Sequence, residues 1–420
     1  MSADPSASYA VEVANLLWPA ADAGAAPYLA RSRRQPAPGV RDAYVFPSTR
    51  SPRLLVPADV PAAASMLRRL GSGRSRLAGP ARAALERAVR TRAFSLSRWP
   101  VLRVPDRGAG ADSIETHLST CFDTDVRVGV LLGTRRVNQK PVLQVFGVDG
   151  RLLGFAKVGH NPLTAELVRR EARSLAAVEA RRPTTFVIPE VLHHGQWAGL
   201  EVLVMSALTT DPQLPVTRAM REAAMREVAG LTATEATELA GSSFWTRLRA
   251  EAGRLAAEPQ VQAQGQRLVA AGDALEQAHG NDPVRLGGWH GDWGHWNMGL
   301  GDGALKVLKV WDWERFDPEV PIGFDALHYA AQAVRPGQRE EASQQETFLR
   351  SVPATLSALG VSPEDHQLTL RLYLLEIATR YVDALTHGAT PALTRRTEWV
   401  LGLLEHHGEP AHHALVEGRS

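Results

Sequence analysis

The sequence of 420 residues predicts an α+β protein in which a small antiparallel sheet comes first and a mainly helical region follows. Two patterns predict this order. Short apolar runs bounded by turn residues fill positions 126–158, and apolar residues at helical spacing dominate from position 217 onward. We expect two lobes, at 101–205 and 206–420, with residues 1–100 as an extension of short strands and Arg-rich helices that packs on the small lobe.

Composition places the chain among ordinary globular proteins, with 44% hydrophobic and 22% charged residues. A net charge of +2 gives no general reason to expect a nucleic acid or another polyanion as partner. Cys121 is the single cysteine, so an intrachain disulfide is excluded. The N-terminus has no signal-peptide pattern and no apolar run reaches ~18 residues. We therefore expect a cytoplasmic protein without a membrane span.

The N-terminal extension contains two short strands within 43–56 and two helical stretches at 61–70 and 80–93, separated by a Gly/Ser break at 71–75. Residues 68–107 are rich in arginine. Such a stretch can mark a nucleic-acid or membrane surface, or it can be the solvated face of a helix. The small net charge favours the solvated face.

Three strands are expected in the small lobe, at 126–133, 141–147 and 152–158. Asp149-Gly150 between the last two is a strong hairpin signal. A helix is expected to begin near Thr164 and to run through Val178.

The second lobe should contain several helices, because apolar residues recur at helical spacing within five segments. These segments are 217–230, 243–257, 261–279, 338–360 and 366–387. In the last segment, Glu376, Arg380 and Asp383 share one helical face. They form either a buried network or an exposed ladder of salt bridges, and both alternatives remain open.

The most informative segment is the loop 290–297, His-Gly-Asp-Trp-Gly-His-Trp-Asn, which is followed by Asp312. Phosphoryl transfer from a nucleotide needs one carboxylate that orients the attacking hydroxyl, plus an Asn and a second carboxylate that hold Mg²⁺. Asp292 is the candidate for the first role, and Asn297 and Asp312 are candidates for the second. His290 completes the catalytic set and is expected to brace the loop by hydrogen bonding.

The segment between Asn297 and Asp312 is expected to form a hairpin, with a strand and a Gly-rich turn over 298–305 and the returning strand at 306–311. This hairpin would bring Asp312 back beside Asn297. The alternative is an ordinary buried hairpin with capping Asp and Asn residues.

These residues resemble the aminoglycoside phosphotransferase and choline kinase group, which has the protein-kinase-like fold. Asp325 in Gly-Phe-Asp-Ala-Leu and Glu314 match the end of the family pattern. The resemblance implies a two-lobed small-molecule kinase. Such an enzyme moves the γ-phosphate of ATP or GTP to a hydroxyl group and depends on Mg²⁺.

The resemblance also implies a lysine on the third strand of the small lobe, which is Lys157 in Phe-Ala-Lys-Val. Glu171 in the following helix would be its ion-pair partner, with Glu166 as the alternative. The sequence has four lysines, and arginines supply the rest of its 47 basic residues. A lysine within an apolar strand therefore indicates a position that needs a compact ammonium group, or else a strand residue that faces solvent.

Residues 133–139 lack the Gly-rich phosphate loop of protein kinases. Arg135, Arg136 and Asn138 are candidates for direct phosphate contact, and a solvated polar turn is the alternative. The resemblance places the connection between the lobes at 202–208, next to the adenine.

Aromatic residues near the loop bear on the acceptor. Trp293, Trp296, Trp313 and Arg315 could line a pocket for a sugar ring or a quaternary amine, or could pack in the core. The helices at 217–257 contain Arg and Glu in similar numbers, which argues against a polycationic aminoglycoside and for another small-molecule alcohol. Two other functions remain open: a catalytically silent kinase-like scaffold, and nucleotidyl transfer on the same fold.

Overall fold

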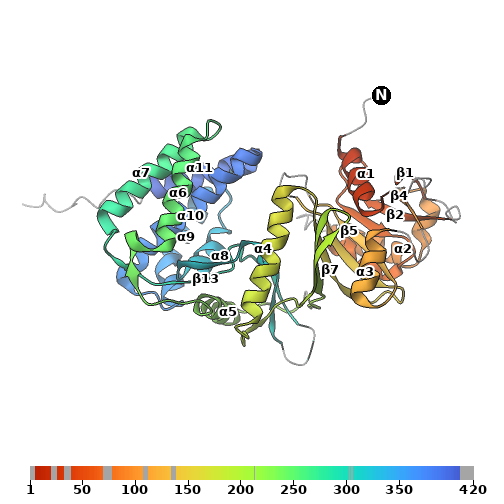
Figure 1. The fold of residues 1–420 in the computed structure, drawn as a ribbon, viewed down its shortest axis with the longest axis horizontal. Helices are drawn as coiled ribbons and strands as arrows, with labels where there is room; N and C mark the ends of the chain where they lie inside the picture. The colour runs from red at the N-terminus through yellow and green to blue at the C-terminus, as the bar shows by residue number, and fades with distance from the viewer. Residues whose placement is uncertain are drawn as a thin grey trace, which may run out of the picture. The chain divides into compact units, whose positions relative to one another are not determined.

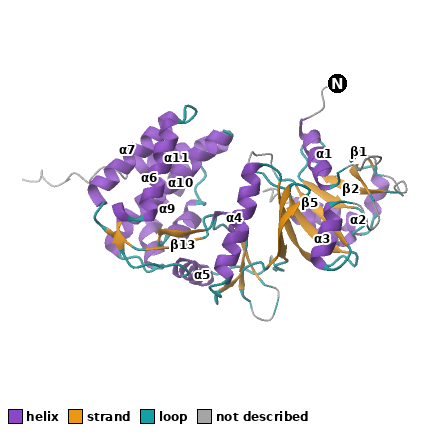
Figure 2. Cartoon of the chain, in the orientation of Figure 1, coloured by secondary structure: helices purple, strands orange, loops and turns teal. Residues whose placement is uncertain are grey.

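The computed structural model describes residues 5–19, 26–32, 39–69, 78–106, 112–133, 139–211, 213–301, 303 and 306–406. The chain divides into two compact units (Figure 1). The sheet unit comprises Met1–Ala176 with Pro189–Leu208, and the helical unit comprises Ala177–Ile188 with Thr209–Ser420. Strands concentrate in the first unit and helices in the second (Figure 2). The predicted α+β architecture, with the antiparallel sheet first, is confirmed.

The sheet unit is built on a nine-stranded antiparallel sheet of order β1-β4-β2-β3-β5-β6-β7-β10-β9. The strands predicted within 126–158 are confirmed as β5, β6 and β7, and Gly150 forms the turn between the last two with φ +83°. The bounds are β1 (Tyr28–Arg31), β2 (Val40–Phe46), β3 (Leu54–Pro57), β4 (Pro100–Pro105), β5 (Val126–Leu131), β6 (Val142–Gly147), β7 (Leu152–Gly159), β9 (Val191–Trp197) and β10 (Leu200–Ser206).

Strands from the N-terminal region continue this sheet, because β3 pairs with β5. Residues 1–100 therefore supply strands to the sheet as well as helices that cover it. The predicted helix at 80–93 is α2 (Ala78–Arg90), and that at 61–70 is a 3-10 helix, Pro61–Arg69. The break at 71–75 lies outside the described residues. Glu86 in α2 accepts hydrogen bonds from Arg68 and Arg90, so part of the Arg-rich stretch is paired within itself.

Helices cover both faces of the sheet. On one face, α1 (Pro5–Leu17) and α3 (Ile114–Phe122) pack Val13, Leu17 and Leu118 against the strands. On the other face, the 3-10 helix and α2 pack Met66 and Val89 against strand residues. The helix α4 (Pro162–Glu179) follows β7, where a helix was expected. Both faces of the central strands are thus covered, and side chains along these strands are shielded from water.

A large core of the helical unit collects residues from α6 through α11. The five predicted helices are confirmed as α5, α6, α7, α9 and α10, each within three residues of the expected ends. The helices α8 and α11 were not predicted. The bounds are α5 (Arg218–Gly230), α6 (Ser243–Ala257), α7 (Gln262–His279), α8 (Phe324–Ala331), α9 (Glu341–Ser357), α10 (His366–His387) and α11 (Pro391–His406).

Short strands join the helices of this unit in three small sheets. They pair β11 (Thr237–Glu238) with β12 (Pro283–Val284), β13 (Leu286–Trp289) with β16 (Asp317–Pro321), and β15 (Leu308–Val310) with both β14 (Met298–Leu300) and β8 (Phe186–Val187). Within the described ranges, no helix is both long and apolar enough to cross a bilayer.

Candidate active site

Lys157 and Glu171 form a buried ion pair in the sheet unit. Lys157 lies on β7, opposite Val142 of β6 and Leu203 of β10. Its Nζ is 2.6 Å from both carboxylate oxygens of Glu171 on α4, and Glu171 is 1% exposed. A buried charge is tolerated when it is paired at this distance. The pairing therefore holds the ammonium group of Lys157 in one position.

The alternative partner, Glu166, is engaged elsewhere. Its carboxylate accepts hydrogen bonds from Arg169 at 3.1 Å and from Arg173 at 2.6 Å, on the solvent side of the same helix. Of the two acids considered in this helix, Glu171 is the one that contacts Lys157.

The expected hairpin after the loop is confirmed in the helical unit. Met298 on β14 is opposite Val310 on β15, and the pairing extends one step further because the Trp311 amide donates to the Asn297 carbonyl at 3.0 Å. Asp312 follows directly and has φ +71°, in the left-handed region that non-glycine residues rarely adopt. Asn297 and Asp312 therefore lie at the same end of the hairpin.

Asp292 and Asn297 are hydrogen-bonded across the loop. The Asn297 Nδ2 donates to Asp292 Oδ2 and to the Asp292 carbonyl, each at 3.0 Å. Asn297 is 4% exposed, whereas the Asp292 side chain is 36% exposed. Since the amide nitrogen is engaged with Asp292, Oδ1 is the atom that Asn297 can offer to a cation. Asp292 keeps one oxygen fixed and remains accessible to a substrate.

His290 is fully buried and uses both ring nitrogens within the protein. Its Nδ1 accepts from the Asp292 amide at 3.3 Å, so Nε2 carries the proton and donates to the Trp311 carbonyl at 3.1 Å. Burial lowers the pKa of this imidazole and favours its neutral form. The ring joins the loop to the returning strand of the hairpin, which is the geometry of a bracing residue.

Asp325 supports the loop backbone from helix α8. Its two carboxylate oxygens accept from the amides of His290 at 2.8 Å and Gly291 at 3.2 Å. Asp325 is 6% exposed, and burial raises its pKa to about 7 against the opposing effect of those two amides and of Arg380. The sequence singled out Asp325 only through the family pattern, because this contact spans about 35 residues.

Arg380 on α10 holds the next peptide group of the loop, on the other side of Gly291. Its Nη1 donates to the Gly291 carbonyl at 3.1 Å, and its guanidinium lies 3.8 Å from the ring centroid of Trp289. Gly291 itself has φ +82°, and a Cβ there would lie 2.3 Å from the Arg315 carbonyl oxygen. The turn before Asp292 therefore requires glycine and is fixed at both its amide and its carbonyl.

The helical face that carries Arg380 was expected to form either a buried network or an exposed ladder of salt bridges, and it has a part of each kind. Glu376 is buried and accepts from Arg380 at 2.9 Å and from Arg247 at 3.4 Å. Asp383 instead accepts from Arg254 at a more exposed position. The first part of the face is a buried network, and the second is a surface ion pair.

The tryptophans near the loop have different surroundings. Trp293 and Trp313 are buried, and their indole nitrogens donate to Met298 Sδ at 3.4 Å and to the Val310 carbonyl at 3.2 Å. These two belong to the core, as the packing alternative expects. Trp296 is 44% exposed and is the member of the group that a ligand could reach.

The three candidate phosphate contacts, Arg135, Arg136 and Asn138, lie outside the described residues. The segment 202–208, expected next to the adenine, begins in β10, which pairs with β7 on one side and β9 on the other.

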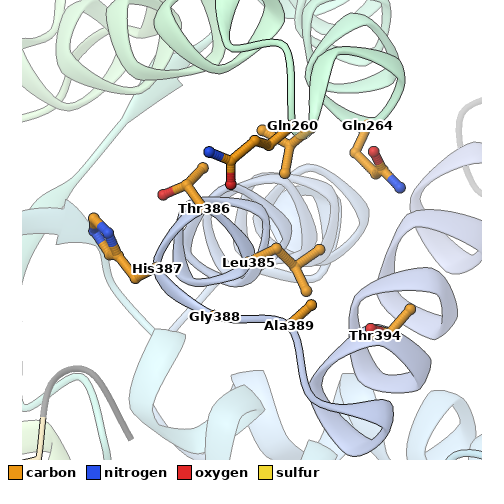
Figure 3. Close-up of a pocket in the computed structure, with 9 residues that line it drawn as sticks. Gln260, Gln264, Leu385, Thr386, His387, Gly388, Ala389 and Thr394 are labelled. Atoms are coloured by element: carbon orange, nitrogen blue, oxygen red, sulfur yellow. The ribbon is translucent and has the colours of Figure 1, made fainter.

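A cavity of about 400 Å³ lies elsewhere in the helical unit, at the C-terminal end of α10 (Figure 3). Its lining consists of Gln260, Val261, Gln264, Leu385, Thr386, His387, Gly388, Ala389 and Thr394, none of which belongs to the loop. Arg380 lies on the same helix, a little more than one turn before Leu385. The cavity is thus separate from the hydrogen-bonded loop.

Comparison with known proteins gives matches to solved structures alone. No family model matches the sequence, and neither does any curated protein. A thermostable mutant of aminoglycoside phosphotransferase APH(4)-Ia, in complex with AMP-PNP and hygromycin B, is 18% identical with a TM-score of 0.44, covering 71% of this chain and 98% of its own. A protein from Haemophilus somnus 129PT, described as a candidate fructosamine-3-kinase, is 12% identical with a TM-score of 0.44, covering 69% and 96%.

A third match is aminoglycoside phosphotransferase APH(3'')-Id from Streptomyces rimosus in complex with ADP and streptomycin. It is 19% identical with a TM-score of 0.36, covering 59% of this chain and 91% of its own. Two of these three structures are named aminoglycoside phosphotransferases. Because the identities and TM-scores are low, the chemistry of this protein must be inferred from its own side chains.

Proposed function

We propose that this protein is a Mg²⁺-dependent small-molecule kinase that transfers the γ-phosphate of ATP or GTP to a hydroxyl group. The observation that carries the proposal is the orientation and exposure of the Asp292 side chain. One of its oxygens is fixed by Asn297 at 3.0 Å, and the side chain remains a third exposed. A carboxylate that is oriented yet accessible is what a hydroxyl nucleophile requires.

In the proposed reaction, Asp292 accepts a hydrogen bond from the acceptor hydroxyl and takes its proton. The acceptor oxygen forms a bond to the γ-phosphorus, and the bond between that phosphorus and the bridging oxygen breaks. The products are a phosphate ester and a nucleoside diphosphate. His290, Asp325 and Arg380 do not touch the substrate in this scheme; they hold the backbone that carries Asp292.

The residues at the end of the hairpin suit a hard cation. The Oδ1 of Asn297 and the carboxylate of Asp312 are oxygen donors of the kind that Mg²⁺ prefers, and they would hold it. When bound, this ion neutralises charge on the phosphate oxygens. Lys157, positioned by Glu171, is proposed to contact the nucleotide phosphates, and Arg135 and Asn138 are proposed as further phosphate contacts.

The acceptor is proposed to be a neutral or singly charged alcohol, such as a sugar or an amino alcohol. Three described acids near the loop are already engaged: Asp325 by two amides, Glu376 by Arg380, and Asp317 by Arg247 at 3.2 Å. These three carboxylates therefore offer little free charge to attract a polycation. This supports the alcohol over an aminoglycoside.

The test is phosphate transfer from labelled ATP or GTP to a panel of small alcohols, with Mg²⁺ and with a chelator. Asp292→Asn keeps the shape and should lower the rate about 10²- to 10⁴-fold, while leaving the free energy of unfolding nearly unchanged. Removal of Mg²⁺ should abolish transfer. If neither the wild type nor the variant transfers phosphate to any acceptor, the result favours the alternative that the protein is a kinase-like scaffold without catalytic activity. If the product mass shows an added nucleoside monophosphate, nucleotidyl transfer replaces this proposal.

A further inference from the structure

A second cluster of chemically active side chains lies in the sheet unit. His117 and Cys121 project from α3, and His193 projects from β9. Each residue offers one ligand atom, and the three atoms lie within 4.8 Å of one another. His117 and Cys121 are four residues apart, so they share one face of their helix. We propose that this cluster binds a divalent ion of the zinc class.

The unsatisfied nitrogens of the two imidazoles support this assignment. The Nε2 atoms of His117 and His193 are both buried, and neither has a hydrogen-bond partner in the part of the chain that the structure describes. Buried polar atoms without partners are rare, and an ion is one of the few explanations for such an atom. Here two of them belong to rings that meet edge to face at 5.2 Å.

Space beside one of these nitrogens comes from a glycine. A Cβ at Gly195 would lie 3.2 Å from His193 Nε2, tighter than an ordinary contact. Gly195 and His193 are two residues apart on β9, so they share one face of the strand. The missing side chain therefore leaves room next to the nitrogen that would bind the ion.

The chemical nature of the three ligand atoms indicates which metal ion the site would bind. One sulfur and two imidazole nitrogens suit Zn²⁺ and similar ions, whereas Mg²⁺ and Ca²⁺ prefer oxygen. Zinc–nitrogen bonds of about 2.0 Å and zinc–sulfur bonds of about 2.3 Å require the three atoms to close to roughly 3.5 Å, which side-chain rotation can supply. Water would complete a tetrahedral site. Cys121 would lose its proton to solvent on binding.

Metal binding releases protons from its ligands, because a thiol and an imidazole must be deprotonated at the atom that binds the ion. Zinc binding should therefore strengthen as the pH rises.

The location suggests what the ion does. β9 is the last strand of the sheet and pairs with β10 alone among its neighbours in the strand order. An edge strand has one free side and is prone to local opening. The ion would tie this strand to α3. Trp197 on the same strand already donates to Asp112, two residues before that helix, at 2.9 Å. It would stabilise the sheet edge and take no part in phosphate transfer.

The test uses the full chain without an affinity tag of histidines, stripped with a chelator and titrated with Co²⁺ and then Zn²⁺. We expect a visible spectrum typical of tetrahedral Co²⁺ with a thiolate charge-transfer band, which Zn²⁺ displaces. Cys121→Ser should lose that band, and His117→Asn and His193→Asn should weaken binding by more than about 10-fold. Bound Zn²⁺ should also raise the melting temperature of the wild type.

Two controls separate this site from other histidines. His194 is the neighbour of His193 but contacts Glu201 at 2.9 Å, so His194→Asn should bind metal like the wild type. Replacement of His407, His412 and His413 in the C-terminal tail by Asn should leave the thiolate band unchanged.

An independent readout needs no variant. Zn²⁺ should protect Cys121 of the wild-type protein from alkylation, measured by mass. Absence of a thiolate band together with unprotected Cys121 overturns the proposal, as does unchanged binding in all three ligand variants. Metal binding is measured without nucleotide, so failure here is distinct from failure of the kinase proposal, and Asp292→Asn should bind Zn²⁺ normally.

Discussion

Each of the two units contains a buried carboxylate, and the two carboxylates have partners of different kinds. Glu171 in the sheet unit meets an ammonium group, with both oxygens 2.6 Å from Lys157 Nζ. Asp325 in the helical unit meets the amides of His290 and Gly291. Glu171 therefore positions a side chain, and Asp325 positions a stretch of backbone. Loss of a partner should leave an unpaired charge in the first case and unsatisfied amides in the second.

The comparison can be tested most strongly at Lys157. Lys157→Met removes the ammonium from a buried carboxylate and should destabilise the fold by about 3–5 kcal/mol. The double variant with Glu171→Gln removes both charges and should recover most of that loss, as urea unfolding would show. Phosphate transfer should stay abolished in both. Recovery of activity in the double variant would mean that Lys157 serves the fold alone.

The matching test in the helical unit is at Asp325. Asp325→Ala leaves two buried amides without an acceptor and should cost roughly 2–5 kcal/mol of unfolding free energy. Asp325→Asn keeps one amide acceptor, so both its stability and its transfer rate should lie between those of Ala and wild type. Equal effects of the two substitutions would show that the amide contacts do not support the loop.

A smaller effect is expected at the turn itself. Gly291→Ala places a Cβ 2.3 Å from the Arg315 carbonyl oxygen at φ +82° and should destabilise the protein by about 1–3 kcal/mol. Gly253 in α6 is the control, because a Cβ there meets nothing within 4 Å. Gly253→Ala should be neutral or stabilise by up to about 1 kcal/mol. Similar unfolding curves for the two variants would contradict a strained loop.

The smallest effect concerns pH. The Asp325 pKa of about 7 in the folded protein is above the ordinary aspartate value of about 3.9. Between these values the folded state binds more protons, so its stability falls as the pH rises and levels off above pH 7. From pH 6 to pH 8, wild type should lose about 1.4 kcal/mol relative to Asp325→Asn. Parallel unfolding energies across this range would contradict the raised pKa.

Activity should respond to pH with the opposite sign. Below pH 7 the protonated Asp325 presents a hydroxyl, which cannot accept from one of the two amides as the carboxylate does. The transfer rate should therefore rise as the pH increases through about 7, and this step should be absent in Asp325→Asn. A rate that rises equally in both proteins would assign the titration to another group.

Much of the fold was predictable because its elements follow local patterns. The helices α6 and α10 have the ends that apolar spacing indicates, and Ser242 caps α6 by accepting from the Trp245 amide. The helix α8 was missed because its eight residues are too short to show a periodic pattern. For the same reason, the short strands β13 and β16 were not predicted.

By itself, the sequence indicated two sets of candidate residues: Asp292, Asn297 and Asp312 around one hairpin, and Lys157 with an acid on the next helix. Within each set the residues are close in the chain, so turns and helix spacing are enough to bring the members of that set together. Only the tertiary structure decided what holds them. Asp325 and Arg380 reach Gly291 across about 35 and 89 residues, and His193 meets His117 from another element. Such contacts depend on packing between distant segments, which no local pattern encodes.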